Sequence, residues 1–429
     1  MTAAVSEHVA RLYDSNPERE WQRMDRHRTE FALTLRALAE HLPPPPARVL
    51  DCGGGPGRYA IELARQGYQV TLFDLSAGNL GLAQQKAAEA GVSLASFEQG
   101  TALDLGRFAA DSFDAVLLLG PLYHLLEAEE RAQALAEATR VLRPGGPLLA
   151  AFISRYAAHR DAAVNYPTEP VEIPGLYEEI ERSGKLLPLA ADPPTFSAYF
   201  THPAEVAPAC WAAGLEVDRV LGLEGFVSIV EDGVNALSGP AWDWWVEANW
   251  RVAADPAIHG AVEHLLVVAN KPRWRRAMAA IARQLDAAGV RFTVSGGAAL
   301  ALHGLSIPVR DLDLTTDRAG VYRFQELFSA QATQPVRYLE SADYRSHFGR
   351  FDIDGVAVEV MAELEWREGE RWLPITAATE TQIDVEGVLV SVAWAEEEFL
   401  AYIRRGRMDR AAFVLPHLDR GRLVALLRC

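Results

Sequence analysis

The sequence has few cysteines and no long apolar run. Only three cysteines occur in 429 residues, Cys52, Cys210 and Cys429, and their spacing fits neither a disulfide framework nor a zinc site. No run of 18 or more apolar residues occurs, and the first residues lack the regions of a signal peptide. We therefore expect no membrane span and a reducing, cytoplasmic setting.

Positive charge is also scarce. The chain has 41 Lys and Arg residues against 58 Asp and Glu residues, a formal net charge of -17. Such a chain repels phosphate backbones at long range. We therefore expect a small-molecule substrate and not a nucleic acid.

The composition is otherwise that of an ordinary globular protein, with 49% hydrophobic and 23% charged residues. The length suggests two or three domains. Residues 7–41 are expected to form a helix that ends at the four prolines 43–46. Strands and helices then alternate, apart from an insertion at about 155–200. The expected strands are 49–52, 69–74, 95–99, 115–119, 147–153, 216–222 and 264–269.

This alternation predicts a mostly parallel sheet with helices on both faces over residues 1–272. A smaller α+β domain is expected over residues 273–429. Its expected strands are 291–294, 311–314, 351–361 and 388–392, and its expected helices are 274–289, 298–303, 321–330 and a helical region at 396–427.

A glycine-rich turn follows the first expected strand. Its sequence from Asp51 to Gly57 is Asp-Cys-Gly-Gly-Gly-Pro-Gly. Missing side chains let the backbone approach a bound cofactor, and the amides of the following helix point at it. Asp74 ends the second strand, where a carboxylate can accept both hydroxyls of a ribose. The adenine would then lie near Leu75 and near Thr101 and Ala102.

Residues 10–272 resemble the class I, Rossmann-like SAM (S-adenosylmethionine)-dependent methyltransferases. The stretch VLDCGGGPGRYAIELARQGYQVTLFDLS is similar to their cofactor motif, and RVLRPGGPLLAAF is similar to their fifth strand and the turn before it. Thr101 stands where many relatives have Asp or another polar residue. The alternative, a nicotinamide dehydrogenase, would need G-x-G-x-x-G, whereas the spacing here is D-x-G-x-G-x-G. The resemblance implies that SAM is bound by Asp51, Gly53, Gly55, Gly57, Asp74, Leu75, Ala102 and Leu119.

Methyl transfer needs an oriented nucleophile and, for some acceptors, a base. Tyr123 and His124 follow the fourth expected strand and should face the sulfonium end of SAM. His124 is the best candidate for the base, because its ordinary pKa is near neutrality; a structural role in the loop is the alternative. Tyr13 lies in the N-terminal helix, which in such enzymes often closes over the cofactor.

A second set of motifs lies in the C-terminal part. Ser295, Gly296 and Gly297 follow a strand and start a helix. Asp311 and Asp313 are alternate residues of a strand and therefore point the same way. Two adjacent carboxylates repel unless a cation lies between them, and hard oxygen ligands suit Mg²⁺ that bridges nucleotide phosphates. Glu359 on a later strand is a third candidate ligand.

Residues 273–425 resemble the DNA polymerase β-like nucleotidyltransferases, most of all the small antibiotic-modifying and toxin-type members. The similarity is carried by FTVSGGAALALHG and VRDLDLTTD. It implies that Asp311, Asp313 and Glu359 form a catalytic metal site, and that Ser295, Gly296 and Gly297 hold a nucleoside triphosphate, with ATP expected. Met408 stands where the family often has Lys, and Glu359 replaces the commoner Asp.

Three functional hypotheses follow from these patterns. The first is a bifunctional enzyme that methylates a small molecule and transfers a nucleotidyl group to a hydroxyl. The second keeps the methyltransferase and makes the C-terminal domain a non-catalytic binding or regulatory module. The third is a toxin-like nucleotidyltransferase that acts on a macromolecule. The negative charge of the chain argues against tRNA as that macromolecule.

Overall fold

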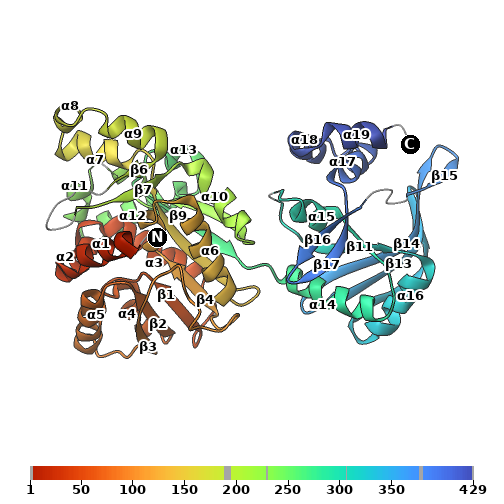
Figure 1. Ribbon diagram of the computed structural model, residues 1–429, viewed down its shortest axis with the longest axis horizontal. Helices are drawn as coiled ribbons and strands as arrows, with labels where there is room; N and C mark the ends of the chain where they lie inside the picture. The colour runs from red at the N-terminus through yellow and green to blue at the C-terminus, as the bar shows by residue number, and fades with distance from the viewer. Residues whose placement is uncertain (1–2, 188–194, 229, 306, 376–379, 428–429) are drawn as a thin grey trace. The chain divides into compact units, whose positions relative to one another are not determined.

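The chain folds into two units, residues 1–271 and 272–429, each with its own sheet and core (Figure 1). The structure is a computed structural model that describes residues 3–187, 195–228, 230–305, 307–375 and 380–427. None of the helices in these ranges is long and apolar enough to cross a membrane. The α/β architecture confirms the fold class that the strand and helix pattern predicts.

The sheet of unit 1 has the order β3-β2-β1-β4-β5-β9-β8. Strands β1 to β5 are parallel, and β9 is antiparallel to both of its neighbours. The carboxyl ends of the parallel strands therefore meet at one edge. The strands are β1 (Arg48–Cys52), β2 (Gln69–Asp74), β3 (Ser96–Gln99), β4 (Ala115–Leu118), β5 (Pro147–Ser154), β8 (Glu216–Gly222) and β9 (His264–Asn270).

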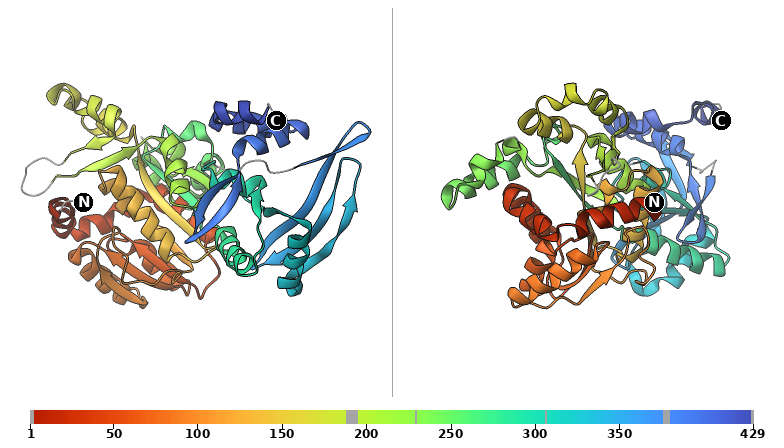
Figure 2. Two further views of the ribbon diagram at one scale, coloured as in Figure 1. Left: turned by 45° about the vertical axis from the view of Figure 1, so that its right-hand side comes forward. Right: turned by 60° about the vertical axis from the view of Figure 1, so that its left-hand side comes forward.

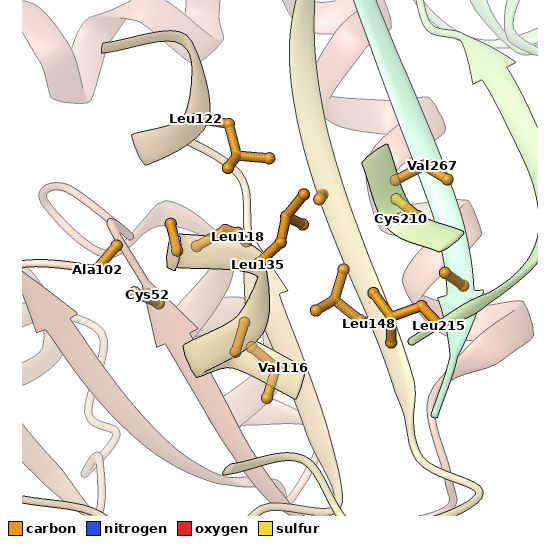
Figure 3. Close-up of a cluster of buried hydrophobic side chains, with 14 of the residues drawn as sticks. Cys52, Ala102, Val116, Leu118, Leu122, Leu135, Leu148, Cys210, Leu215 and Val267 are labelled. Atoms are coloured by element: carbon orange, nitrogen blue, oxygen red, sulfur yellow. The ribbon is translucent and has the colours of Figure 1, made fainter. Parts of the chain in front are cut away.

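Helices cover both faces of this sheet, and each face has its own buried cluster. On one face the strands pack against α6 (Ala128–Val141) and α10 (Pro203–Ala212); Figure 3 shows Leu135 of α6 and Cys210 of α10 beside Leu118 and Leu148 of the sheet. The other face packs against α3 (Arg28–His41), α4 (Arg58–Arg65), α5 (Ala77–Glu89) and α12 (Pro240–Val252).

The N-terminal region departs from the single helix expected over residues 7–41. It forms three helices, α1 (Ala3–Asp14), α2 (Pro17–Arg26) and α3. The Asn16 side chain accepts a hydrogen bond from the Arg19 amide, and Pro17 is the first helical residue of α2. Asn before Pro is a helix start signal that outweighs the continuous apolar spacing.

The insertion contributes to the sheet as well as covering it. Its helices are α7 (Ala157–Asn165), α8 (Glu169–Glu172) and α9 (Leu176–Ser183), and β6 (Lys185–Leu186) follows them. Strand β7 (Ala198–Thr201) then pairs in parallel with the end of β5. The short helices α11 (Glu231–Asn235) and α13 (Pro256–His259) lie between β8 and β9 in the chain.

Unit 2 contains a mixed sheet of order β12-β13-β14-β11-β10-β17-β16, and β15 pairs with β14. Helices α14 (Arg273–Ala287) and α16 (Arg318–Leu327) share a buried cluster with this sheet. The strands are β10 (Thr293–Ser295), β11 (Asp311–Thr316), β12 (Ala332–Glu340), β13 (Tyr344–Ile353), β14 (Val356–Glu368), β15 (Arg371–Pro374), β16 (Glu380–Val385) and β17 (Val388–Ala393).

The strand expected over residues 351–361 is wrong, because the chain reverses there. Asp354 and Gly355 have φ values of 55° and 75° and connect β13 to β14, which is the backbone of a tight hairpin turn. The unit ends in α17 (Ala395–Arg404), α18 (Met408–Val414) and α19 (Arg420–Leu426), drawn in blue in Figure 2. Helix α15 (Gly296–Leu302) packs against α17 in a second buried cluster of this unit, which contains Leu300 and Phe399.

Candidate functional sites

The glycine-rich turn of unit 1 requires its glycines for two reasons. Gly53, Gly55 and Gly57 have φ values of 73°, 56° and 84°, a region that residues with a side chain rarely adopt. A Cβ atom on Gly53 would also lie 2.4 Å from the Cδ atom of Pro121, in the loop after β4. The turn therefore fits closely against the end of the neighbouring strand, and Gly53 and Gly55 line the cavity at this edge of the sheet.

Asp74 lies at the end of β2 and is bound by backbone amides. Its Oδ2 atom accepts a hydrogen bond from the Gly55 amide at 2.8 Å, and its Oδ1 atom accepts one from the Ser76 amide at 2.8 Å. Burial raises the pKa of Asp74, and these amides act against that rise. A carboxylate oxygen can accept more than one hydrogen bond, so both oxygens retain capacity for the hydroxyls of a ribose.

Asp51 lies behind the turn and not in the cavity. It is fully buried at the end of β1. Burial, and secondarily the nearby Asp74 carboxylate, raise the pKa of Asp51 to about 7. A Cβ atom on Gly54 would lie 2.5 Å from this carboxylate. Asp51 therefore supports the turn from beneath, and Gly57 and Leu119 likewise do not line the cavity.

A cavity of about 90 Å³ lies at the carboxyl edge of the parallel strands. Nine of the residues expected at the cofactor and acceptor positions line it: Tyr13, Gly53, Gly55, Asp74, Leu75, Thr101, Ala102, Tyr123 and His124. Gly100 and Gly120, at the ends of the third and fourth expected strands, line it as well, and the sequence prediction missed six others: Val9, Glu20, Phe73, Asn79, Pro121 and Leu125. The donors, the close backbone and the lining fit a nucleoside-containing cofactor.

His124 is buried and bonded on both ring nitrogens. Its Nδ1 atom lies 3.1 Å from the Ser197 carbonyl oxygen, which can only accept, so Nδ1 carries the proton. The Nε2 atom then accepts a hydrogen bond from the Tyr13 hydroxyl at 2.6 Å. Burial lowers the pKa of His124 to about 4. The imidazole is therefore neutral near pH 7, and its lone pair is directed at helix α1; its role as a base stays a prediction.

A buried ion network beside this edge gave no sequence signal. Glu30 accepts two hydrogen bonds of 2.8 Å from Arg23, and His264 Nδ1 donates to Glu224 Oε1 at 2.7 Å. The ligand atoms of Glu30, Glu224 and His264 lie within 4.8 Å of one another. Arg23 and two backbone amides already engage both carboxylates. The network therefore ties α2 and α3 to the start of β9.

In unit 2, the pairing register brings the predicted acidic residues together. Asp313 of β11 lies opposite Ser295 of β10 and opposite Glu359 of β14. Asp311 precedes Asp313 by two positions on the same face of the strand, whose other face is buried. Burial raises the pKa of Asp313 to about 7, with further contributions from the carboxylates of Asp311, Glu398 and Glu359. A divalent cation would relieve this repulsion.

Glu359 is already paired with a cation. Its Oε1 atom accepts a hydrogen bond of 2.8 Å from the Nε atom of Arg350, its neighbour across the β13–β14 hairpin. Among the described residues, the three predicted carboxylates do not form a group with all ligand atoms within 4.8 Å. The oxygen donors fit Mg²⁺, but Glu359 must turn away from Arg350 to share an ion with the two aspartates.

Gly296 is in direct contact with the acidic group. Its φ value is 68°, and a Cβ atom there would lie 2.0 Å from Asp313 Oδ2. Its amide donates a hydrogen bond of 2.7 Å to the Oε1 atom of Glu398 on α17. Burial raises the pKa of Glu398. Glu398 is thus a fourth carboxylate of this site; it belongs to the run Glu396 to Glu398, where nothing in the sequence indicates which side chain turns inward.

A cavity of about 340 Å³ opens beside these residues. Ser295, Gly296 and Asp313 line it, and Asp311, Gly297 and Glu359 do not. Arg404 and Arg405, at the end of α17, also line it, and the sequence prediction missed both. Met408 is 61% exposed and lies outside this lining.

Comparison with known proteins gives a different family for each unit. The methyltransferase domain family matches residues 49–146. The aminoglycoside-2''-adenylyltransferase family matches residues 277–413. The matched ranges contain the glycine-rich turn with Asp74 and the Gly296 turn with Asp311 and Asp313, respectively.

Curated relatives match unit 1. The ubiquinone biosynthesis O-methyltransferase of Xanthomonas axonopodis pv. citri (strain 306) is 31% identical over 191 residues, which is 44% of this chain and 72% of the relative. The tRNA 5-carboxymethoxyuridine methyltransferase of Escherichia coli (strain K12) is 39% identical over 125 residues, 29% of this chain. This chain spans only 45% of that second relative.

Solved structures resemble each unit at low TM-scores. A SAM-dependent methyltransferase of Methanosarcina mazei is 21% identical, covers 55% of this chain and 97% of its own, and has a TM-score of 0.38. A Thermotoga maritima protein assigned as a nucleotidyltransferase is 29% identical, covers 34% of this chain and 92% of its own, and has a TM-score of 0.31.

The fold and the first site define an enzyme of the Rossmann-like class with a nucleotidyltransferase domain attached to it. The chain belongs to the SAM-dependent methyltransferase family.

Proposed function

We propose that unit 1 transfers a methyl group from SAM to a small molecule. The observation that carries this proposal is the pairing of the Gly53–Gly57 turn with Asp74, whose two oxygens are held by amides and directed at one cavity. SAM would supply a methyl group that is already activated as a sulfonium. The chain has to bind SAM, orient the acceptor and remove a proton where the acceptor carries one.

Tyr13, Tyr123 and His124 line the cavity and would face the acceptor. Because His124 Nε2 accepts the hydrogen bond from Tyr13, a proton released by the acceptor can reach the imidazole by way of that hydroxyl. Glu20 lines the same cavity and would favour an acceptor that carries positive charge.

Thermal unfolding with SAM and S-adenosylhomocysteine tests the cofactor assignment. A ligand at about 100 times its dissociation constant adds roughly 2.7 kcal/mol to the native state. The stabilisation should disappear in Asp74→Ala and persist in Asp104→Ala, which removes a carboxylate outside the cavity lining. Stabilisation that survives Asp74→Ala would contradict this assignment.

For unit 2 we propose nucleotidyl transfer from a Mg²⁺-bound nucleoside triphosphate, ATP in the first instance, to a hydroxyl. The observation that carries it is the register that aligns Ser295, Asp313 and Glu359 on neighbouring strands. Asp311 and Asp313 would hold the metal, and Glu359 would complete the site or accept the proton of the hydroxyl. The metal would supply charge stabilisation at the transferred phosphate.

The acceptor we propose is an amino sugar of the aminoglycoside kind, the substrate class in the name of the matched family. The net charge of -17 and the carboxylates of both cavities suit a polycationic small molecule. The same charge disfavours tRNA, on which one methyltransferase relative acts. We place the activity in the cytoplasm, since Cys52 and Cys210 are free thiols.

Labelled nucleotide transfer to aminoglycosides, with each nucleoside triphosphate and Mg²⁺, tests this second activity. Transfer by the intact chain that is lost in Asp311→Ala with Asp313→Ala is the expected result. If no nucleotide binds or reacts while SAM still stabilises unit 1, the C-terminal domain is a non-catalytic module of a methyltransferase. Growth arrest on expression, relieved by the same double change, would favour a toxin-like action on a macromolecule.

A further inference from the structure

The Gly296 amide already holds an anion that belongs to the chain. Glu398 Oε1 accepts its hydrogen bond at 2.7 Å. In the proposed function, Ser295, Gly296 and Gly297 bind the phosphates of the nucleotide. A phosphate and the Glu398 carboxylate would therefore use the same donor, and both cannot accept from it at full strength.

Charge makes this competition stronger. A Cβ atom on Gly296 would almost touch Asp313 Oδ2, so the amide lies beside the metal-binding aspartate. Glu398 and Asp313 both line the cavity at this amide, so two carboxylates already lie close together there. A phosphate that bridges the Gly296 amide and a metal on Asp313 would lie where the Glu398 carboxylate lies now. Two anions at that place would repel each other.

The cavity lining also carries the positive charge that such a phosphate needs. Arg405 and Arg404 both line the cavity, as does Glu398. The Nε atom of Arg405 donates to the Tyr344 hydroxyl at 3.2 Å, and its guanidinium lies 5.3 Å from the centre of that ring. A guanidinium has five N–H donors, so Arg405 can keep Tyr344 and still bind phosphate.

We propose that Glu398 holds the place of a nucleotide phosphate at the Gly296 amide, and that Arg405 binds the phosphate once it displaces this carboxylate. This inference rests on the proposed nucleotide site of unit 2. Arg405 would take the role that the resemblance assigns to a lysine at the position of Met408, which is exposed and outside the cavity lining. Glu398 then sets the affinity for nucleotide and is a positioning residue.

Titration calorimetry on the full chain, with Mg²⁺-pyrophosphate and with Mg²⁺-ATP, tests the inference. Glu398→Gln keeps the shape and an acceptor for the Gly296 amide but removes the charge. We expect pyrophosphate to bind on the order of three- to tenfold more tightly to Glu398→Gln. Asp409→Asn removes the same charge from an exposed position of α18 outside the cavity lining and should change the affinity less than about twofold.

Arg405→Gln should weaken pyrophosphate binding by about tenfold, because a charge-assisted contact to phosphate is lost. Arg407→Gln removes the same charge from a position outside the cavity lining, and its effect should stay within about twofold. Pyrophosphate omits the base and sugar, so these ratios report on phosphate contacts alone.

Each other outcome has a definite meaning. Unchanged pyrophosphate affinity in Glu398→Gln, with ATP still bound, overturns the inference and leaves the nucleotide site in place. Weaker binding together with a lower melting temperature makes Glu398 a structural support and also overturns it. Unchanged affinity with lost turnover makes Glu398 a proton acceptor instead. Absence of binding in all variants refutes the nucleotide function and this inference together, whereas binding only in Glu398→Gln supports both.

Discussion

Asp74 of unit 1 and Asp313 of unit 2 are buried carboxylates on sheet strands, but their surroundings differ. Backbone amides of Gly55 and Ser76 approach the two oxygens of Asp74. Asp313 instead faces three other carboxylates, and its pKa rises to about 7. The amides hold the Asp74 carboxylate in place, whereas a group of carboxylates needs a cation to offset its repulsion. Asp74 is therefore positioned in advance for a cofactor, whereas the activity proposed for unit 2 would depend on a metal ion.

Glycine serves the two sites in the same way. Gly53 leaves room for Pro121, and Gly296 leaves room for the Asp313 carboxylate. Both have positive φ values, 73° and 68°. In unit 1 the space admits a neighbouring loop that shapes the cavity, and in unit 2 it admits a charged group directly. The glycine in unit 2 is therefore part of the electrostatic site, and that in unit 1 is part of its scaffold.

The largest expected effect is that of removing the aspartates of unit 2. Asp311→Ala with Asp313→Ala should lower nucleotidyl transfer on the order of 10³-fold or more, since the metal loses its ligands. Methyl transfer by the same protein should be unchanged and serves as the internal control. Transfer of labelled nucleotide and of labelled methyl, measured side by side, gives both rates. Loss of both activities would mean that the change has disturbed the chain as a whole.

A glycine change in unit 1 should have the next largest effect. In Gly53→Ala the added carbon meets Pro121 at 2.4 Å and φ stays at 73°. We expect SAM affinity to fall by at least about tenfold and stability by about 1–3 kcal/mol. Gly81→Ala, in helix α5 with no atom within 4 Å of the new carbon, should raise stability by about 0.5–1 kcal/mol. Calorimetry with S-adenosylhomocysteine and urea unfolding measure both quantities, and equal effects of the two changes would refute the steric account.

The sequence predicts the strands of unit 1 well for a physical reason. Short apolar runs bounded by glycine or a charged residue leave a strong local pattern, so β2 and β8 have the predicted bounds and β1 differs by one residue. The N-terminal helix and the β13–β14 hairpin were mispredicted, because apolar spacing was followed across the helix start at Asn16 and the Asp354–Gly355 turn. Both signals are present in the sequence, and they outweigh the apolar spacing.

The site residues also differ in how far the sequence could predict them. Residues of the turns and strand ends, such as Asp74, Leu75 and Asp313, lie at the cavities where they were expected. Glu20 and Glu398 reach these cavities from other helices, and that depends on how the helices pack. A helical carboxylate has no local feature that distinguishes a cavity position from a solvated one. Such residues could be found only from the structure.

A pH series tests the buried ion network of unit 1, which has no equivalent among the described contacts of the unit 2 site. Burial alone would lower the pKa of His264, but Glu30 and Glu224 raise it to about 9. A raised histidine pKa stabilises the fold fully below its ordinary value of 6.5, and this stabilisation is lost as pH rises through about 9. His27, whose pKa is raised against the effect of burial by Glu231, acts in the same direction.

Glu30 of this network and the adjacent Glu263, whose amide donates to Glu224 Oε2, titrate at lower pH. Burial raises the pKa of Glu263 from 4.5 to about 7. The protonated side chain therefore stabilises the fold at low pH, and this stabilisation is lost as the pH rises from 4.5 to 7. Arg23 and His264 lower the pKa of Glu30 to about 2 against the effect of burial, and its contribution is lost only in strong acid. The unfolding free energy of unit 1 should therefore fall by about 2 kcal/mol between pH 7 and 9, and His264→Gln should flatten this fall. If the unfolding free energy of His264→Gln still falls between pH 7 and 9, another group causes the pH dependence.

The smallest expected effect concerns the bond between Tyr13 and His124. Tyr13→Phe keeps the ring and removes the hydroxyl that donates to His124 Nε2 at 2.6 Å. A buried acceptor left without its donor costs about 1 kcal/mol, so unit 1 should melt slightly earlier. If a proton passes from the acceptor to His124 through this hydroxyl, kcat for methyl transfer should fall about tenfold while KM for SAM changes little.

The direction of that change separates two roles for His124. Tyr13→Phe also frees Nε2 for direct contact with the acceptor, so an imidazole that acts directly would keep or raise kcat. Because burial holds the pKa of His124 at about 4, the neutral form prevails from pH 6 to 8, and the rate should be flat there in the wild type. A kcat that rises through pH 6.5 would mean that the acceptor brings the imidazole into contact with water or with a carboxylate. The side chain would then be a base formed on substrate binding, and the Tyr13 bond would be the contact that holds it before the substrate arrives.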